Sequence, residues 1–249
     1  MTQYLKTQSG RTLAYVKTEG ISPGIVFLGG FKSDMQGTKA LDLEKWARAN
    51  GRAFLRFDYS GHGQSSQSFT DGCIGDWAED AKVALTSLTE GRQVLVGSSM
   101  GGWISLILAL KIPEKLAAIV GIATAADFTE DSMWAGLSPE QRTEMATTGQ
   151  VALPSEYGEP YIITSRLIED GRQHLVLRKP LNLPFPTRFL QGTADEDVDI
   201  SVALHILDHA TGDDIRLNLV KNADHRFSTP ECLTLIQSSV DEVIERAAG

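Results

Sequence analysis

The sequence is poor in cysteine and has no long apolar run. Its 249 residues include only Cys73 and Cys232, too few for a disulfide framework, so we expect free or buried thiols in a reducing compartment. No apolar run reaches the roughly 18–20 residues that span a bilayer. Residues 1–6 lack the apolar core of a signal peptide. The sequence therefore predicts a cytoplasmic protein without a membrane span.

Excess positive charge and the usual cofactor motifs are also absent. The formal net charge is −9 at pH 7, which argues against nucleic acid or an anionic membrane surface as a partner. Cysteines and histidines do not have zinc spacing, and residues 97–102 match neither a P-loop nor the dinucleotide pattern G-x-G-x-x-G. We expect neither a metal nor a cofactor, and the sequence leaves the oligomeric state open.

What is present is an alternation of apolar strands and amphipathic helices. Buried strands are predicted at residues 24–28, 53–57, 94–96, 116–122 and 187–191, with alternating strands at 12–19 and 215–220. Helical spacing separates them at 38–50, 74–88, 103–110 and 201–210, and a last helix runs from 229 to about 247. This order predicts one α/β domain over residues 1–249, with a mostly parallel sheet between helices.

The alternation stops between residues 124 and 183, where no core strand is predicted. Two amphipathic helices are expected there, at about residues 139–147 and 161–170, and prolines at 180, 184 and 186 mark the return to the core. A structureless insertion of this length is uncommon in a compact domain. We therefore expect residues 124–185 to form a small helical cap over the carboxyl edge of the sheet.

A short turn after the third buried strand carries the strongest chemical signal. Gly97-Ser98-Ser99-Met100-Gly101 lies between an apolar strand and a helix and matches the G-x-S-x-G nucleophile elbow. Side chains at the two glycines would clash where strand and helix approach each other. The apex of such a turn is usually forced to positive φ, which a serine tolerates at an energetic cost. Ser99 is therefore the candidate nucleophile.

Two further strand-end loops supply the partners that a serine nucleophile needs. His225 follows the strand at 215–220 and is the candidate base, and Asp195 follows the strand at 187–191 and is the candidate carboxylate that orients it. Ligands of open α/β sheets bind at these strand ends. Asp127 and Asp197 remain alternative acids. We expect Asp58 and His62 to have structural roles in their loop.

The oxyanion of a tetrahedral intermediate needs preorganised backbone donors. The N–H of Met100 follows the nucleophile at a helix N-terminus, and the N–H of Phe31 follows Gly29-Gly30 at the end of a strand. Met100 and Phe31 are therefore the candidate oxyanion-hole residues.

Four segments in this order resemble the α/β-hydrolase superfamily: residues 27–31, residues 58–65, residues 97–102, and Gly192-Thr193-Ala194-Asp195 with Asp224-His225. Residues 29–40 and 56–61 look like the branch that contains a mitochondrial palmitoyl-protein thioesterase that also cleaves acyl glucuronides. The resemblance implies hydrolysis of acyl esters or thioesters and carries the roles of nucleophile, acid and base onto Ser99, Asp195 and His225. Many relatives have His-Gly where this chain has Gly29-Gly30.

We therefore expect a serine hydrolase whose substrate is a small-molecule acyl ester or thioester. Cap and loop residues are candidates for an acyl pocket, although the cap residues are equally suited to holding the cap on the core: Gly30, Met133, Trp134, Leu137 and Tyr157. Arginines and a lysine of the cap either meet an anionic acyl donor or form a solvated face: Arg166, Arg172, Arg178 and Lys179. An acyltransferase or perhydrolase with the same triad, or a non-catalytic binding protein, are the alternatives.

Overall fold

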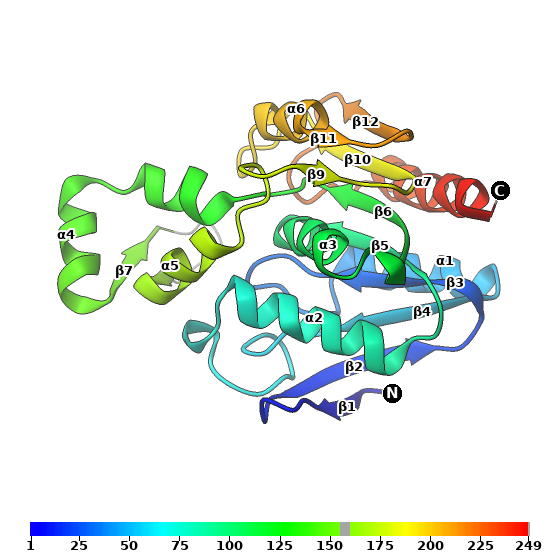
Figure 1. The fold of residues 1–249 in the computed structure, drawn as a ribbon, viewed down its shortest axis with the longest axis horizontal. Helices are drawn as coiled ribbons and strands as arrows, with labels where there is room; N and C mark the ends of the chain where they lie inside the picture. The colour runs from blue at the N-terminus through cyan, green and yellow to red at the C-terminus, as the bar shows by residue number, and fades with distance from the viewer. Residues whose placement is uncertain (155–159, 249) are drawn as a thin grey trace.

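A computed structural model describes residues 1–154 and 160–248 of the chain. An eight-stranded sheet forms its centre, with the strand order β1-β2-β4-β3-β5-β6-β10-β12 (Figure 1). Its strands are β1 (Gln3–Lys6), β2 (Thr12–Thr18), β3 (Ile21–Leu28), β4 (Arg52–Phe57), β5 (Gln93–Ser98), β6 (Leu116–Ile122), β10 (Thr187–Gly192) and β12 (Ile215–Val220). β2 pairs antiparallel with β1 and with β4, and the remaining pairs are parallel. The predicted mostly parallel sheet is confirmed.

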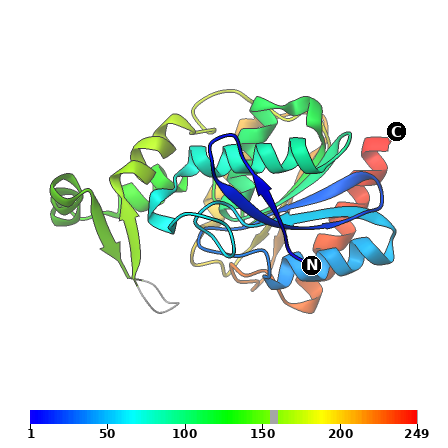
Figure 2. The same cartoon turned by 90° about the horizontal axis from the view of Figure 1, so that it is seen from below.

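Helices cover both faces of the sheet. α2 (Ile74–Leu88) and α3 (Met100–Lys111) lie on one face, and α1 (Thr38–Ala49) and α7 (Pro230–Ala248) lie on the other, as Figure 2 shows. The sheet has an apolar core on each face, and successive residues of β3 point to opposite faces. Val26 packs with α2 and α3, while Ile25 packs with α1 and α7. α6 (Ile200–His209) packs beside β10 and β12. None of the described helices is both long enough and apolar enough to cross a membrane.

The segment predicted as a cap lies at one end of the molecule, with α4 and β7 projecting away from the sheet (Figure 1). It holds the short helical turn η3 (Thr129–Trp134), α4 (Pro139–Thr148), β7 (Gln150–Leu153), β8 (Tyr161–Thr164), α5 (Ser165–Gln173) and β9 (Leu181–Asn182). β7 and β8 form an antiparallel pair, and β9 pairs with β11 (Ala210–Thr211). Short helical turns also occur at η1 (Phe69–Asp71) and η2 (Pro113–Lys115).

The second cap helix begins later than predicted. The sequence predicted a helix over residues 161–170, but the first four residues form strand β8 and the helix starts at Ser165. Tyr161-Ile162-Ile163-Thr164 is aromatic and β-branched, a composition that suits a strand, and it finds a partner in β7. Thr164 then caps α5 by accepting a hydrogen bond from the N–H of Leu167.

Candidate active site

The turn between β5 and α3 places Ser99 in a strained backbone conformation. Ser99 has φ 54° and ψ −116°, so the predicted positive φ is confirmed. The two flanking glycines are sterically required. A Cβ on Gly97 would lie 2.3 Å from the carbonyl oxygen of Gly101, and a Cβ on Gly101 would lie 2.0 Å from that of Leu28. The turn therefore presents the Ser99 hydroxyl at the carboxyl edge of the sheet.

Ser99, His225 and Asp195 come together at this edge. The Nε2 atom of His225 lies 3.2 Å from the Ser99 hydroxyl oxygen, within reach of its proton. The Nδ1 atom of His225 lies 3.0 and 3.1 Å from the two carboxylate oxygens of Asp195. The Asp195 side chain is buried, while the His225 side chain is 22% exposed, so the imidazole can be reached from the cavity. This chain of contacts can move a proton from a hydroxyl to an imidazole next to a fixed negative charge.

The Asp195 carboxylate is held ionised by its surroundings. Burial raises its pKa, but hydrogen bonds from His225, from the Val198 N–H and from the Gln191 side chain outweigh burial and lower the pKa below its usual value. The Val198 N–H donates at 2.8 Å and Gln191 Nε2 at 2.9 Å. Asp195 therefore remains a negative charge at neutral pH.

The two alternative acids sit in different surroundings. Asp127 is fully buried in the segment after β6, where it accepts the N–H groups of Val176 and Leu177 at 2.8 and 3.0 Å and pairs with Arg178. These contacts hold the start of the cap to its end. Asp197 is exposed beside Asp195, and its carboxylate, that of Asp195 and the His225 imidazole offer ligand atoms within 4.8 Å of one another. The Asp195–His225 hydrogen bonds already engage two members of this group.

The two oxyanion candidates flank Ser99. Met100 is the first residue of α3, so its N–H has no partner within the helix. Phe31 lies in the loop after β3, and a Cβ on Gly30 would be 3.4 Å from that of Ser99, which places this loop against Ser99. Hydrogen bonds on either side of the Phe31 loop fix its course: the Ser33 N–H donates to the Gly30 carbonyl, and the Lys32 N–H donates to His62 Nε2.

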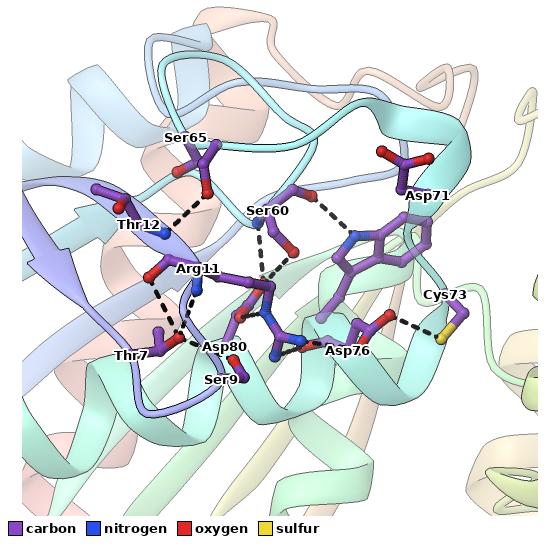
Figure 3. A network of polar contacts seen from close by, with 12 residues as sticks. Thr7, Ser9, Arg11, Thr12, Ser60, Ser65, Asp71, Cys73, Asp76 and Asp80 are labelled. Atoms are coloured by element: carbon purple, nitrogen blue, oxygen red, sulfur yellow. Dashed lines mark hydrogen bonds and ion pairs between the residues drawn. The ribbon is translucent and has the colours of Figure 1, made fainter.

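His62 belongs to the loop after β4, which a polar network anchors. Within the network, the Ser60 N–H and hydroxyl both donate to Asp80, at 2.9 and 2.6 Å (Figure 3). Arg11 donates to Asp80 at 2.8 Å from the turn between β1 and β2. The Trp77 indole N–H donates to the Ser60 carbonyl at 3.0 Å. In the same loop, Asp58 accepts the N–H groups of Met35 and Gln64 at 2.7 and 2.8 Å, which is a structural role.

A cavity of about 780 Å³ opens onto Ser99 and His225. One side is apolar and is formed by Phe31, Phe128, Met133 and Tyr161, with the Phe31 ring in edge contact with the rings of Phe128 and Tyr161. Of the predicted pocket residues, Gly30 and Met133 line it. Trp134 and Leu137 lie outside its lining, and Tyr157 lies outside the described residues.

Trp134 and Leu137 have other partners. The guanidinium groups of Arg142 and Arg172 lie over the Trp134 ring, at 5.1 and 4.7 Å from its centroid. Leu137 is buried in the core cluster that the cap shares with α2, α3 and the sheet. Leu137 therefore packs the cap against the core, while the cation contacts of Trp134 lie within the cap.

The cations around the cavity are not the cap cations for which the sequence left two roles open. Three cap arginines are engaged in ion pairs: Arg166 with Asp76, Arg172 with Glu130, and Arg178 with Asp127 and Asp131. The cavity is instead lined by Lys32, Lys39 and Arg226. Two of these neighbour residues that the sequence had identified, since Lys32 follows Phe31 and Arg226 follows His225. Their position next to these residues in the sequence was the signal from which the two cations could have been predicted.

Comparisons with known proteins agree with this architecture. A family model described as alpha/beta hydrolase fold matches residues 29–155. The chain is 35% identical over 245 residues to the mitochondrial palmitoyl-protein thioesterase ABHD10 of Rattus norvegicus, covering 98% of this chain and 82% of the relative. The corresponding Homo sapiens protein is 36% identical over 236 residues, covering 94% of this chain and 77% of the relative. The structure of alpha/beta hydrolase domain-containing protein 10 from mouse superposes with a TM-score of 0.91 at 35% identity, covering 98% of both chains.

One expectation from the sequence is overturned by these relatives. The rat and human relatives are named as mitochondrial proteins. This contradicts the cytoplasmic location that residues 1–6 and the cysteine count predicted. The low cysteine count fits any reducing compartment, so it does not distinguish the cytoplasm from the interior of such an organelle.

Proposed function

This chain belongs to the α/β-hydrolase family, and on that premise we propose that it hydrolyses acyl thioesters and carboxyl esters through an acyl-Ser99 intermediate. One observation carries the proposal: a continuous line of contacts from the Ser99 hydroxyl through His225 to the buried carboxylate of Asp195. A serine hydroxyl is a weak nucleophile until an adjacent base accepts its proton.

In the acylation half-reaction, Ser99 Oγ attacks the carbonyl carbon while His225 Nε2 takes the hydroxyl proton. Asp195 stabilises the resulting imidazolium through Nδ1. The negative charge that develops on the carbonyl oxygen is met by the N–H groups of Phe31 and Met100. The tetrahedral intermediate then collapses, and the leaving thiol or alcohol departs with the proton from His225.

Deacylation repeats these steps with water. His225 removes a proton from a water molecule, which attacks the carbonyl carbon of acyl-Ser99. Collapse of the second intermediate releases the carboxylic acid and returns the proton to Ser99.

The shape of the cavity supports an acyl donor with an apolar chain. Phe31, Phe128, Met133 and Tyr161 form an apolar side next to Ser99, suited to a hydrocarbon chain. The relatives are named palmitoyl-protein thioesterases, which points to long acyl thioesters as the first substrates to try.

The proposal is tested by labelling with a serine-directed fluorophosphonate and by a hydrolysis series. We expect one adduct, on Ser99, and none in Ser99→Ala. Hydrolysis should occur with p-nitrophenyl esters and acyl thioesters of rising chain length and be lost in Ser99→Ala. A folded protein that neither labels nor hydrolyses would instead be a binding protein. Transfer of the acyl group to an added alcohol or peroxide in preference to water would reassign the enzyme as an acyltransferase or perhydrolase.

A further inference from the structure

Lys39 reaches from α1 to the loop that carries His225. Its Nζ atom donates a hydrogen bond to the backbone carbonyl of Arg226, the residue directly after His225. Lys39 also lines the cavity that holds Ser99 and a smaller adjoining cavity of about 180 Å³. The contact therefore joins the helix on one side of the site to the base on the other.

The His225 loop needs such an anchor because its backbone is strained. Asn222 and Phe227, on either side of His225, have φ 62° and 48°, in the left-handed region that non-glycine residues rarely adopt. Toward β10, the Ala194 N–H donates to the Ala223 carbonyl at 3.0 Å and the Asn222 N–H to the Thr193 hydroxyl at 2.9 Å. Lys39, on α1, holds the same loop by binding the carbonyl of Arg226, the residue next to His225.

The ammonium group occupies this place at a cost in stability. Burial lowers the pKa of Lys39 to about 8, in spite of the attraction of Asp224 and Asp195. Cys232 also attracts the charge and Arg226 repels it. A methionine at position 39 would avoid the cost of desolvating a charge. The fold therefore keeps an energetically unfavourable ammonium group at the point where it contacts the His225 loop.

We propose that Lys39 is a positioning residue for the hydrolysis described above: its ammonium group holds the Arg226 carbonyl and thereby keeps the His225 imidazole between Ser99 and Asp195. The inference rests on the proposed function. A charged donor forms a stronger hydrogen bond to a carbonyl than a neutral amine does, so the protonated form of Lys39 is the form that supports turnover.

Three variants test the role of the ammonium group with p-nitrophenyl butyrate as substrate. Lys39→Met removes the donor and the charge, and we expect kcat to fall on the order of 10-fold to 100-fold with a smaller change in KM, as for a misplaced catalytic group. Lys39→Arg keeps the charge and should retain most of kcat at pH 7. Lys45→Met is the matched control, since Lys45 is exposed on the same helix, and it should behave as wild type. Wild-type kcat in Lys39→Met would overturn the proposal.

The pH profile separates positioning from a purely structural role. Wild-type kcat should fall as the pH rises through about 8, the pKa of Lys39. Lys39→Arg should lack this fall, and Lys39→Met should be low and flat. Because the folded-state pKa lies below the ordinary 10.5, the folded protein binds fewer protons than the unfolded chain between these values, so the contribution of Lys39 to stability increases over the same range. Deprotonation of Lys39 itself therefore does not destabilise the fold there, and a melting curve at each pH checks that the protein remains folded.

A wild-type kcat that stays level from about pH 7 to 9.5 would overturn the inference even if Lys39→Met failed to fold. Fluorophosphonate labelling separates this failure from failure of the proposed function. A level profile with Ser99 labelled removes only the role of Lys39, whereas an unlabelled Ser99 in the folded wild-type protein removes the hydrolase itself.

Discussion

The Nε2 atom of His62 accepts a hydrogen bond from the backbone N–H of Lys32 at 3.2 Å, which ties the loop after β4 to the loop of Phe31. The Nδ1 atom lies 3.2 Å from the Ser60 carbonyl, so Nδ1 carries the proton that is donated there. Burial lowers the pKa of His62 to about 4, and the ring therefore stays neutral near pH 7 with Nε2 as an acceptor. His62 thus helps to fix the N–H of Phe31 beside Ser99.

Replacing His62 should impair catalysis and change the response to acid. We expect His62→Phe to lower kcat by about 10-fold or more, because the Phe31 N–H, the proposed oxyanion donor, loses its support. An exposed histidine on α6 provides the matched control, and His205→Phe should leave kcat unchanged. Steady-state kinetics with one ester measures both variants, and equal kcat in the two would contradict the structural tie.

The same residue sets a pH dependence of stability. The folded-state pKa of about 4 lies below the ordinary 6.5, so the unfolded chain binds more protons between these values. The contribution of His62 is present above pH 6.5 and is lost as the pH falls toward 4, by up to on the order of 3 kcal/mol. Urea unfolding at several pH values should show a shallower dependence in His62→Phe than in wild type.

Asp195 and Asp127 should respond differently to the same substitution. Asp195→Asn removes the charge that orients His225, and kcat should fall by about 10⁴-fold without loss of the fold. Asp127→Asn disturbs a buried carboxylate with two N–H donors and Arg178, so we expect lower stability, by about 1–3 kcal/mol, with kcat nearly retained. Steady-state kinetics and thermal melts of both variants measure these two effects. The reverse pattern of activity would make Asp127 the acid.

Gly101 should tolerate no side chain. A Cβ there would lie 2.0 Å from the Leu28 carbonyl oxygen, a backbone atom that cannot move aside without shifting β3. We expect Gly101→Ala to destabilise the fold by at least about 3 kcal/mol or to prevent folding. Gly136→Ala is the control, since no heavy atom lies within 4 Å of its added Cβ. Equal melting temperatures for the two variants would show that α3 can withdraw from the sheet.

Met133 should set the length of acyl chain that the cavity accepts. It lines the apolar side of the cavity, so Met133→Trp fills part of the space and should shift the preferred p-nitrophenyl ester to shorter chains, by several-fold in kcat/KM for each two carbons at the long end. Leu137→Ala is a useful contrast because Leu137 is buried in the core and does not line the cavity. It should lower stability without changing chain preference. A preference that moves in Leu137→Ala alone would place the acyl chain elsewhere.

Local sequence was sufficient for the elements whose geometry depends on nearby residues. The turn at Ser99 was predictable because Gly97 and Gly101 leave room for only one backbone path between β5 and α3. β1 escaped prediction because Gln3–Lys6 is a short edge strand, largely exposed, with no apolar alternation. Its partner β2 is what makes it a strand.

The cavity could be predicted only in part, because its lining is assembled by tertiary packing. Nothing in the cap sequence distinguishes Arg166 and Arg178, which form ion pairs with Asp76 and Asp127, from cations that face a substrate. Lys39 reaches the His225 loop from a helix that lies far away in the chain. Pairings over such distances leave no periodic signal in a single sequence.

Trapping the acyl-enzyme shows whether Ser99 carries the acyl group during turnover. The wild-type protein is mixed with a long-chain acyl thioester, quenched with acid within the first turnovers, and digested for mass spectrometry. We expect the acyl mass on Ser99, decaying as the thioester is consumed and absent in Ser99→Ala. Turnover of the thioester with Ser99 never acylated, and with Ser99→Ala still active, would mean that Ser99 is not the nucleophile.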